Sequence, residues 1–191
     1  ATYDAERRPH ATEMVQFATR IGAMYRPKNI VTERFRDLVF RGVQRIPGGR
    51  DYVLQMKYKP MPRYTEGFVA GVEPKRKDDP VGRMFPQPHV EVAGERVLLD
   101  ELLGDWFAVL CTGDVGRDGL DPETLAWWES IGARVLTSDD FADNDGVLAA
   151  WRSEHDEVDV VVLRPDRYVA AACHRGSFGA ATQALRSCLS P

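Results

Sequence analysis

What this 191-residue chain has little of narrows the classes it can belong to. Its three cysteines are widely separated, so the sequence offers neither a disulfide framework nor a Cys-x-x-Cys dithiol. No apolar run reaches the ~18 residues of a membrane span, and no signal peptide precedes the charged opening. The net charge of −4 gives no electrostatic reason to expect a nucleic-acid partner. These absences predict a cytoplasmic protein without membrane, nucleic-acid or dithiol chemistry.

Residue types that often carry catalysis also lack the spacing that catalysis needs. The histidines, His10, His89, His155 and His174, show no metal-ligand spacing. Ser177 is not surrounded by a G-x-S-x-G elbow and suits the N-cap of a closing helix instead. We therefore expect no catalytic, cofactor-binding or metal-binding residue in this chain.

Two glycine-rich and acidic stretches resemble binding loops only in composition. In "GDVGRDG" the glycines at 113, 116 and 119 are spaced G-x-x-G-x-x-G, whereas a dinucleotide fingerprint requires G-x-G-x-x-G. Asp114 and Asp118 could ligate calcium, but Leu125 stands where the bidentate carboxylate belongs. The stretch "DDFADNDG" fails the same test, because Arg152 occupies that position. Both stretches are predicted to be solvated turns.

The cysteines are predicted to be structural thiols. Cys111 lies in an apolar run, Cys173 ends a predicted strand, and Cys188 falls on the apolar face of a predicted helix. A free cysteine is most often a small core residue. We therefore expect all three to be buried and unreactive.

Two helices are predicted before residue 47. Apolar residues recur at three- and four-residue spacing in two sets that Pro27 separates. The sets are Met14, Phe17, Ala18, Ile21, Met24 and Tyr25, then Val31, Phe35, Leu38, Val39, Val43 and Ile46. Two helices bury little by themselves, so these apolar faces need a partner surface. Residues 1–46 are therefore expected to be a helical segment whose apolar faces pack against another surface.

Residues 47–80 change in character. Seven of the twelve prolines lie between Pro47 and Pro88, and a charged run covers residues 75–79. This composition predicts an extended connector rather than a packed element. The stretch "YVLQMKYK", residues 52–59, could form a short strand or a helical turn within it.

From residue 81 onward strands and helices alternate. The stretches "HVEVAG", "ERVLLDELLG", "ARVLTS" and "NDGVLAAWRSEH" predict two strands with a helical turn, a further strand and a helix. "WFAVLCT" is a continuous apolar run, as in a strand buried on both faces. "DPETLAWWESIG" predicts a helix with Asp121 as N-cap, Pro122 at its first position and Gly132 as its stop. With a hairpin and a closing helix, residues 81–191 predict an α/β fold with a thioredoxin-like mixed sheet, flanking helices and no CxxC.

The hairpin and one helix carry the most conspicuous side chains. Pro165 suits the second position of a type I turn and Asp166 the third. Arg164 and Arg167 flank this turn and are predicted to pair with Asp159 or Asp166, a structural role rather than a ligand site.

Trp127 and Trp128 are adjacent on a predicted helix. One ring must therefore face the core and the other must face outward. The outward ring is either a contact surface or covered by a loop, and the sequence leaves both readings open.

Several stretches resemble one family, the class A FAD-dependent aromatic hydroxylases, and within it the 3-(3-hydroxyphenyl)propionate hydroxylases. "YDAERRPHA" resembles the helix after the flavin-domain Gly-Asp motif, and "KYKPMPRY" with "PVGRMFPQPHVEV" resembles the connector that follows. "LLDELLGDWFAVL" with "VVVLRPDRYVAA" resembles the family's thioredoxin-like C-terminal domain, which also lacks redox cysteines. The family's FAD-binding motifs do not occur here. The resemblance therefore implies the C-terminal fragment of such an enzyme.

The resemblance also implies a chemistry and a partner. The parent enzyme would hydroxylate a phenolic acid with FAD, NAD(P)H and O2, and the fragment itself would be structural, non-catalytic and free of bound cofactor. Its partner would be the missing N-terminal FAD-binding domain, with a homo-oligomer as a further option. Glu6, Arg7 and Arg8 are then candidates for an interdomain ion-pair network, against the alternative of an exposed charged helical turn.

A second hypothesis belongs to another class. The chain would be a standalone thioredoxin-like interaction or dimerisation module without redox activity. Such a module must cover the apolar residues Phe17, Ile21, Phe35 and Leu38 within its own fold or at a dimer interface.

Overall fold

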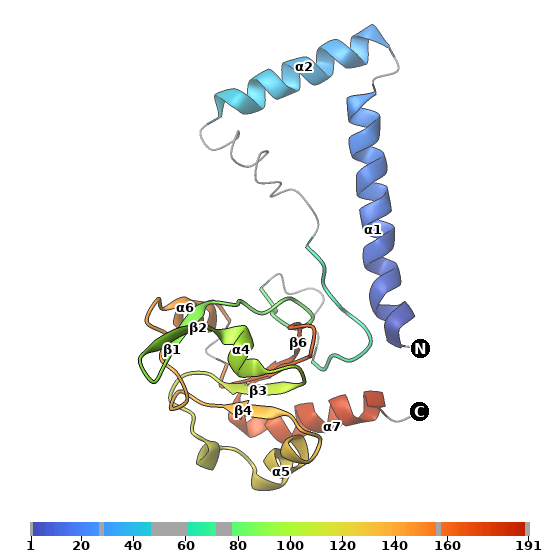
Figure 1. Cartoon of the computed structure of the whole chain (residues 1–191). Coiled ribbons are helices and arrows are strands. Elements are labelled where there is room, and N and C mark those ends of the chain that lie inside the picture. Colours follow the sequence, from blue (N-terminus) through green and yellow to red (C-terminus); the bar gives the residue numbers. More distant parts are fainter. Residues whose placement is uncertain (1, 27–28, 47–60, 72–77, 156–157, 190–191) are drawn as a thin grey trace. The chain divides into compact units, whose positions relative to one another are not determined.

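The computed structural model describes residues 2–26, 29–46, 61–71, 78–155 and 158–189, and Figure 1 shows the elements in chain order. They are α1 (Thr2–Tyr25), α2 (Ile30–Arg45), β1 (His89–Val92), β2 (Glu95–Leu98), α4 (Leu99–Leu103), β3 (Ala108–Cys111), α5 (Pro122–Ser130), β4 (Arg134–Leu136), α6 (Val147–Glu154), β5 (Val160–Leu163), β6 (Val169–Cys173) and α7 (Phe178–Leu189). The chain divides into two compact units. Unit 1 comprises residues 1–6 and 63–191, and unit 2 comprises residues 7–62.

Unit 1 is built on a mixed four-stranded sheet. The strand order is β4-β3-β5-β6, in which β3 runs parallel to β4 and antiparallel to β5, and β5 runs antiparallel to β6. Val109 in β3 lies opposite Val135 in β4 and Val162 in β5. Strands β1 and β2 form a separate antiparallel hairpin. The predicted mixed sheet with flanking helices is therefore confirmed.

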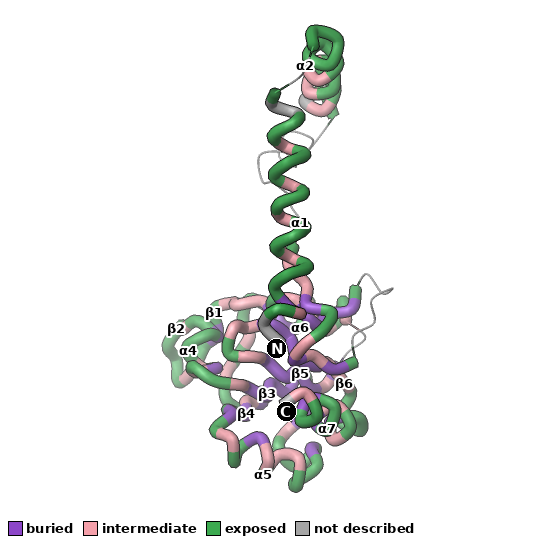
Figure 2. The backbone as a smooth tube through the Cα atoms, turned by 90° about the vertical axis from the view of Figure 1, so that its right-hand side faces the viewer, coloured by how far each residue is buried: buried purple, intermediate pink, exposed green. Residues whose placement is uncertain are grey.

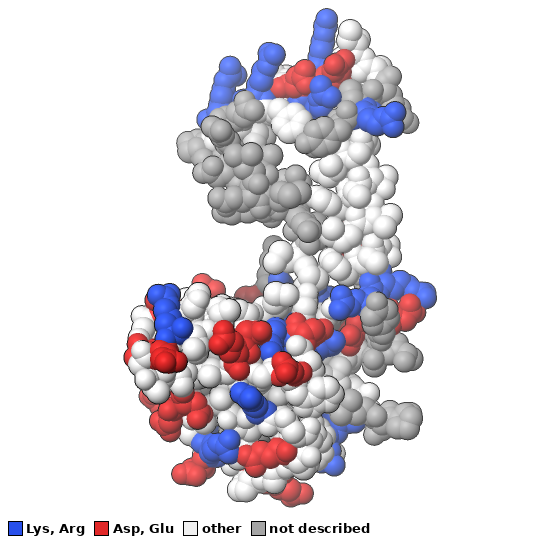
Figure 3. Space-filling model, in the orientation of Figure 1, with Lys and Arg blue, Asp and Glu red and all other residues white. Residues whose placement is uncertain are grey.

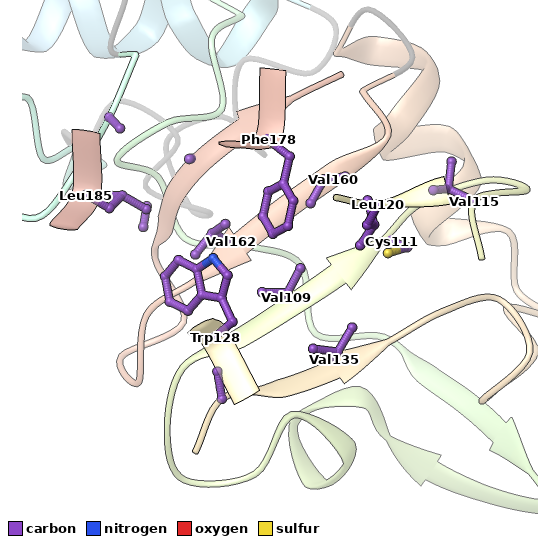
Figure 4. Close-up of a cluster of buried hydrophobic side chains, with 14 of the residues drawn as sticks. Val109, Cys111, Val115, Leu120, Trp128, Val135, Val160, Val162, Phe178 and Leu185 are labelled. Atoms are coloured by element: carbon purple, nitrogen blue, oxygen red, sulfur yellow. The ribbon is translucent and has the colours of Figure 1, made fainter. Parts of the chain in front are cut away.

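One face of this sheet packs against α5 and α7. Val109 and Val162 point to this face, where they meet Trp128 from α5 and Phe178 and Leu185 from α7 (Figure 4). Trp128 is fully buried, and its ring Nε1–H donates to Thr182 Oγ1 at 2.9 Å. The indole therefore fills the core without leaving its polar atom unpaired.

The other face packs against α4, α6 and the β1–β2 hairpin. The alternate strand residues Leu110 and Val161 point to this face and meet Leu99, Leu103 and Leu148. Every residue of β3 and of β5 is consequently buried. The prediction that the apolar run "WFAVLCT" contains a strand buried on both faces is confirmed.

Local signals set the ends of the helices in unit 1. Helix α5 starts as predicted, because Asp121 accepts a hydrogen bond from the Thr124 backbone N–H at 2.8 Å and Pro122 follows it. The helix ends at Ser130, and Gly132 then adopts a φ of 81°. Helix α6 has a cap that the sequence analysis missed, because the Asp143 carboxylate accepts from the backbone N–H groups of three consecutive residues, 147–149.

The described part of the predicted connector 47–80 differs from expectation. It forms no helix or strand, yet Tyr64 and Phe68 are buried in unit 1. The Ala70 backbone N–H donates to the Ala170 carbonyl at 2.8 Å. Prolines remove single donors from a segment but leave its side chains and remaining amides free to pack. The proline-rich composition therefore did not reveal that the segment around Tyr64 and Phe68 contributes to the core.

Before residue 47 both predicted helices are confirmed. Helix α2 starts at a capping box, in which Asn29 Oδ1 accepts from the Thr32 backbone N–H at 2.9 Å. Figure 2 shows α1 and α2 largely exposed, while the strands of unit 1 are largely buried. Pro27 and the predicted element at 52–59 lie outside the described residues. In the parts of the chain that the structure describes, no helix combines the length and apolar character needed to cross a membrane.

Candidate functional site

The turn that connects β5 to β6 carries charged side chains with several partners in unit 1. The Arg167 backbone N–H donates to the Arg164 carbonyl at 2.9 Å, which closes the predicted turn over Pro165 and Asp166. Arg164 N–H in turn donates to the Tyr168 carbonyl at 3.0 Å, so the loop has three residues. Arg167 then takes a left-handed φ of 64°, the conformation that a three-residue hairpin loop requires at its last position.

Arg164 makes a buried, two-point ion pair with Glu6 at the start of α1. Its Nη1 and Nη2 each donate to one Glu6 carboxylate oxygen at 2.8 Å. The Phe68 backbone N–H donates to Glu6 Oε1 at 2.9 Å, and Glu6 is only 7% exposed. Gly67 allows this approach, because a Cβ there would lie 2.3 Å from Glu6 Oε1. The Glu6 carboxylate therefore has a two-point ion pair and a backbone N–H donor, which satisfy its hydrogen-bonding capacity despite its burial.

A second carboxylate and an aromatic ring complete the surroundings of Arg164. Asp166 Oδ1 accepts from Arg164 Nε at 3.0 Å, and the guanidinium carbon lies 4.9 Å from the centre of the Tyr64 ring. Burial by itself would lower the pKa of Arg164, but the hydrogen bonds and negative charges of Glu6 and Asp166 outweigh it and raise the pKa. Arg164 is therefore a permanent cation held between two carboxylates.

Arg167, the other arginine of the turn, has a different partner from the one predicted. It donates to the Asp100 carboxylate and to the Gly104 carbonyl, which joins the hairpin to helix α4. Asp159, the other predicted partner, lies near Arg152 and Arg175 at 3.9 and 3.7 Å. Only the pairing of Arg164 with Asp166 is confirmed. The structural role predicted for both arginines agrees with these contacts.

Both Glu6 and Arg164 were singled out by the sequence, but their pairing was not predicted. The structure pairs Glu6 with Arg164 inside unit 1, whereas Arg7 and Arg8 are exposed and belong to unit 2. Glu6 and Arg164 are 158 residues apart, and no local pattern connects them. The interdomain ion-pair network therefore stays a prediction for Arg7 and Arg8.

The cysteines differ in burial. Cys111 is buried as predicted, whereas Cys173 and Cys188 are only partly buried. Burial raises the pKa of the Cys111 thiol to about 11, and burial reinforced by the nearby charge of Asp159 raises that of Cys173 to about 11. Since the thiolate is the reactive form, neither thiol is activated at neutral pH.

Cys111 and Cys173 also stand too far apart to form a disulfide. Val160 in β5 lies opposite Cys111 on one side and opposite Cys173 on the other. Two strand spacings place the cysteine Cα atoms about 10 Å apart. A disulfide requires Cα atoms within about 7 Å, so this pair cannot close without movement of the backbone.

The glycine-rich loop after β3 does not fit a dinucleotide. Gly113 adopts a φ of 66°, and a Cβ there would lie 3.0 Å from Arg152 Cζ. The glycine therefore makes room for a side chain of the protein itself. The loop continues into the 3₁₀ turn Arg117–Gly119, not into the N-terminus of a helix that could hold a pyrophosphate. Asp114 and Asp118 are exposed, as predicted for a solvated turn.

No metal centre appears in the described part of the chain. Among those residues no group of three or more His, Cys, Asp or Glu side chains is placed to hold an ion. Ser177 lies directly before α7 and within a 3₁₀ turn, at the helix start where the sequence placed it.

The tryptophan pair on α5 divides as predicted. Trp128 is fully buried, and the partly buried Trp127 packs edge-on against it at 4.8 Å between ring centres. Part of the Trp127 ring is covered by a side chain from another helix. Arg186 from α7 places its guanidinium carbon 5.0 Å from the centre of the Trp127 ring.

Helix α2 presents an apolar stripe. Its members are highly exposed: Val31 at 71%, Phe35 at 67%, Leu38 at 65% and Val39 at 47%. Basic side chains lie along this helix in Figure 3 with acidic ones between them, and both signs of charge are also interspersed over unit 1 in that view. An apolar stripe at helical spacing beside basic residues is typical of a surface that packs against another polypeptide.

Comparison with known proteins identifies relatives of the chain. The sequence profile of the HcaD C-terminal domain matches residues 82–188. The 3-(3-hydroxy-phenyl)propionate/3-hydroxycinnamic acid hydroxylase of Mycobacterium avium (strain 104) is 40% identical over 90% of this chain. The enzyme of that name from Burkholderia cenocepacia (strain HI2424) is 36% identical over 98% of it. The chain spans only 32% and 37% of these relatives, about a third of their length.

Solved structures share the fold at lower identity. The anhydrotetracycline hydroxylase OxyS from Streptomyces rimosus aligns with 97% of this chain and 34% of its own, with a TM-score of 0.65 and 21% identity. RebC with bound 7-carboxy-K252c aligns with 98% of this chain and 36% of its own, with a TM-score of 0.60 and 20% identity. These values establish a common fold. The resemblance to the C-terminal part of aromatic hydroxylases is confirmed by the profile and by the curated relatives.

Proposed function

We propose that this chain, which belongs to the family of the HcaD C-terminal domain, is the C-terminal part of an aromatic hydroxylase that uses FAD, NAD(P)H and O2 on a phenolic acid. The activity for which relatives that are 36–40% identical are named supports the phenolic substrate class. The chain spans about a third of those relatives, which leaves room for a flavin-binding portion in the longer protein. FAD would supply the oxygen chemistry in that flavin-binding portion. The glycine loop after β3 does not fit a dinucleotide, so it is not proposed as the FAD site.

The role proposed for the chain itself is architectural and non-catalytic. The observation that carries it is the buried ion pair between Glu6 and Arg164. Residues 3–11 resemble the helix that follows the flavin domain in this family, and the pair attaches the start of that helix to the β5–β6 hairpin. Two parallel hydrogen bonds specify orientation as well as attachment. Unit 1 thereby holds the joint through which the flavin domain continues into the chain.

The apolar stripe of α2 supports a partner in the same longer protein. Phe35 and Leu38 are each about two-thirds exposed. Side chains of this size are stabilised by about 1.5–3 kcal/mol each when they are fully buried, so a surface that covers them contributes appreciably to docking. The proposed partner is the N-terminal FAD-binding domain, which the helical segment 1–46 would meet. Tyr64 and Phe68, in the predicted connector 47–80, pack with the domain 81–191 in unit 1.

The strand order supports a thioredoxin-like description of the domain. The sheet has the order β4-β3-β5-β6. Its strands β3 and β4 are parallel, and β5 and β6 are joined as a hairpin, which is the arrangement expected for such a sheet. The proposed location is the cytoplasm, where the unpaired cysteines would stay reduced. The high thiol pKa values of Cys111 and Cys173 support a domain without redox activity.

The experiment compares this chain with the longer polypeptide encoded by its reading frame. The chain alone is expected to be colourless and not to oxidise NADH when FAD and 3-(3-hydroxyphenyl)propionate are added. The longer polypeptide is expected to carry flavin and to couple NADH oxidation to that acid. Flavin absorbance that co-elutes with the chain alone would contradict the non-catalytic role.

A second candidate function is a standalone interaction or dimerisation module. The exposed stripe of α2 favours it equally, because two such stripes could cover each other. Light scattering as a function of concentration separates the two candidates. A dimer that dissociates on Phe35→Asp substitution would support the module. A chain that stays monomeric at all concentrations, with and without the substitution, would support the fragment.

A further inference from the structure

Unit 1 carries an apolar hollow of about 540 Å³ beside the Arg164 turn. Its walls include Phe68, Trp106, Phe107, Ile131 and Cys188. The Phe107 ring lies 5.1 Å from both the Phe68 and the Trp106 ring centres, so three aromatic rings are contiguous. Trp106 is 51% exposed. A concave aromatic surface with a half-exposed tryptophan is typical of a site that takes a large apolar group.

Charges at the rim restrict what this hollow can accept. Glu6, Arg164 and Asp166 all line it. The guanidinium already pairs with both carboxylates, so the three side chains together carry one net negative charge. A carboxylate ligand would meet like charge and find no unpaired cation among these three residues. The chemistry therefore favours an apolar side chain flanked by neutral or basic groups.

The course of the chain points to the source of such a group. Glu6 belongs to the rim, and α1 begins four residues earlier, at Thr2. At 1.5 Å of rise per residue, this helix start lies about 6 Å from Glu6 along the helix axis. Any polypeptide joined to the front of α1 therefore leaves from the rim of the hollow. A segment tethered so closely has an effective concentration of order millimolar and needs little intrinsic affinity.

We propose that the hollow binds the segment directly upstream of Ala1 in the longer protein, and that one large apolar side chain of this segment packs against Trp106. The proposal rests on the proposed function, which supplies the upstream segment. The buried pair of Glu6 and Arg164 fixes the helix start, and the hollow would fix the residues before it. Together they would make a two-point attachment of the flavin domain to unit 1.

The test follows the exposure of Trp106 in the two polypeptides. Both are labelled with 5-fluorotryptophan, and Trp106→Phe assigns the relevant ¹⁹F resonance. A soluble paramagnetic agent is expected to broaden this resonance in the chain alone and to leave it sharp in the longer protein. The Trp151 resonance, from the other side of the sheet, serves as the internal control and should respond equally in both.

A second variant separates occupation of the hollow from a general change in fold. Ile131→Arg in the longer protein fills the hollow with a long side chain and should restore the broadening of Trp106. Val147→Arg, a matched substitution on α6 outside the hollow, should not. Circular dichroism of both variants reports whether the fold of unit 1 is retained.

The outcomes distinguish this proposal from the proposed function. If the longer protein carries flavin while Trp106 stays broadened, the hollow proposal is overturned and the proposed function stands. If the upstream segment protects Trp106 but no flavin is bound, the hollow proposal stands and the proposed function fails. Protection that appears in the chain alone and grows with its concentration would make a second copy the occupant and overturn the proposal, as would a reading frame that begins at Ala1.

Discussion

Similar apolar residues are buried in the sheet of unit 1 and exposed on helix α2. Val109 and Leu163 in the sheet are 0% exposed, whereas Val31 and Leu38 on α2 are 71% and 65% exposed. The central strands carry continuous apolar runs and α2 carries an apolar stripe at helical spacing, each as expected of its secondary structure. What differs is the covering layer, since helices from elsewhere in unit 1 pack over both faces of its sheet. The local apolar pattern thus creates a surface that can be buried, and only packing against a second element buries it.

The largest effect expected from this comparison is in the core. Trp128→Ala removes a fully buried indole and the partner of Thr182, and should lower the free energy of unfolding by about 3–5 kcal/mol. Urea denaturation followed by circular dichroism measures this. Trp106→Phe, at a half-exposed position, is the control and should change little. Similar losses for both variants would mean that burial does not separate these sites.

A smaller loss is expected at the joint between α1 and the hairpin. Glu6→Gln keeps the size of the side chain but removes its charge from the buried pair with Arg164, and should cost about 2–3 kcal/mol. Hydrogen exchange of the amides near residue 6 and urea denaturation both report it. Glu13→Gln, at an exposed position of the same helix, should stay within about 0.5 kcal/mol. An equal effect of the two substitutions would remove the pair as the attachment point.

Alkaline pH should weaken the core through Cys111. Its pKa rises from an ordinary 9.0 to about 11 in the folded state, so the unfolded chain loses its thiol proton first. The stabilisation is fully present below pH 9 and is lost between about pH 9 and 11, by about 2 kcal/mol for this group. Urea denaturation from pH 7.5 to 10.5 measures the slope. Cys111→Ala should make the slope shallower, and an unchanged slope would contradict the assignment.

The smallest effect is expected on α2, and it sharpens the comparison most. Phe35→Ala should change the unfolding of this chain by less than about 0.5 kcal/mol, because the ring is 67% exposed. In the longer protein the same substitution should cost about 3 kcal/mol, since a docked partner would bury the ring. Parallel denaturation of the two polypeptides tests this. A silent substitution in both would leave the stripe without a partner in the longer protein.

Much of unit 1 beyond residue 88 could be predicted because its determinants are local. The buried run of β3, the N-cap Asp121 and the stop at Gly132 each depend on a few neighbouring residues. The segment around Tyr64 and Phe68 could not be predicted. Its burial depends on strand β6 about 100 residues later, and its prolines are typical of a connector.

The candidate site shows the same division. The sequence alone identified Arg164 and Arg167 as turn residues and excluded a dithiol, because turn propensity and cysteine spacing are properties of adjacent residues. The pairing of Arg164 with Glu6, the attachment of Arg167 to Asp100 and the aromatic hollow were decided by the tertiary structure. They join segments up to 158 residues apart, and such contacts exist only once the sheet has brought those segments together.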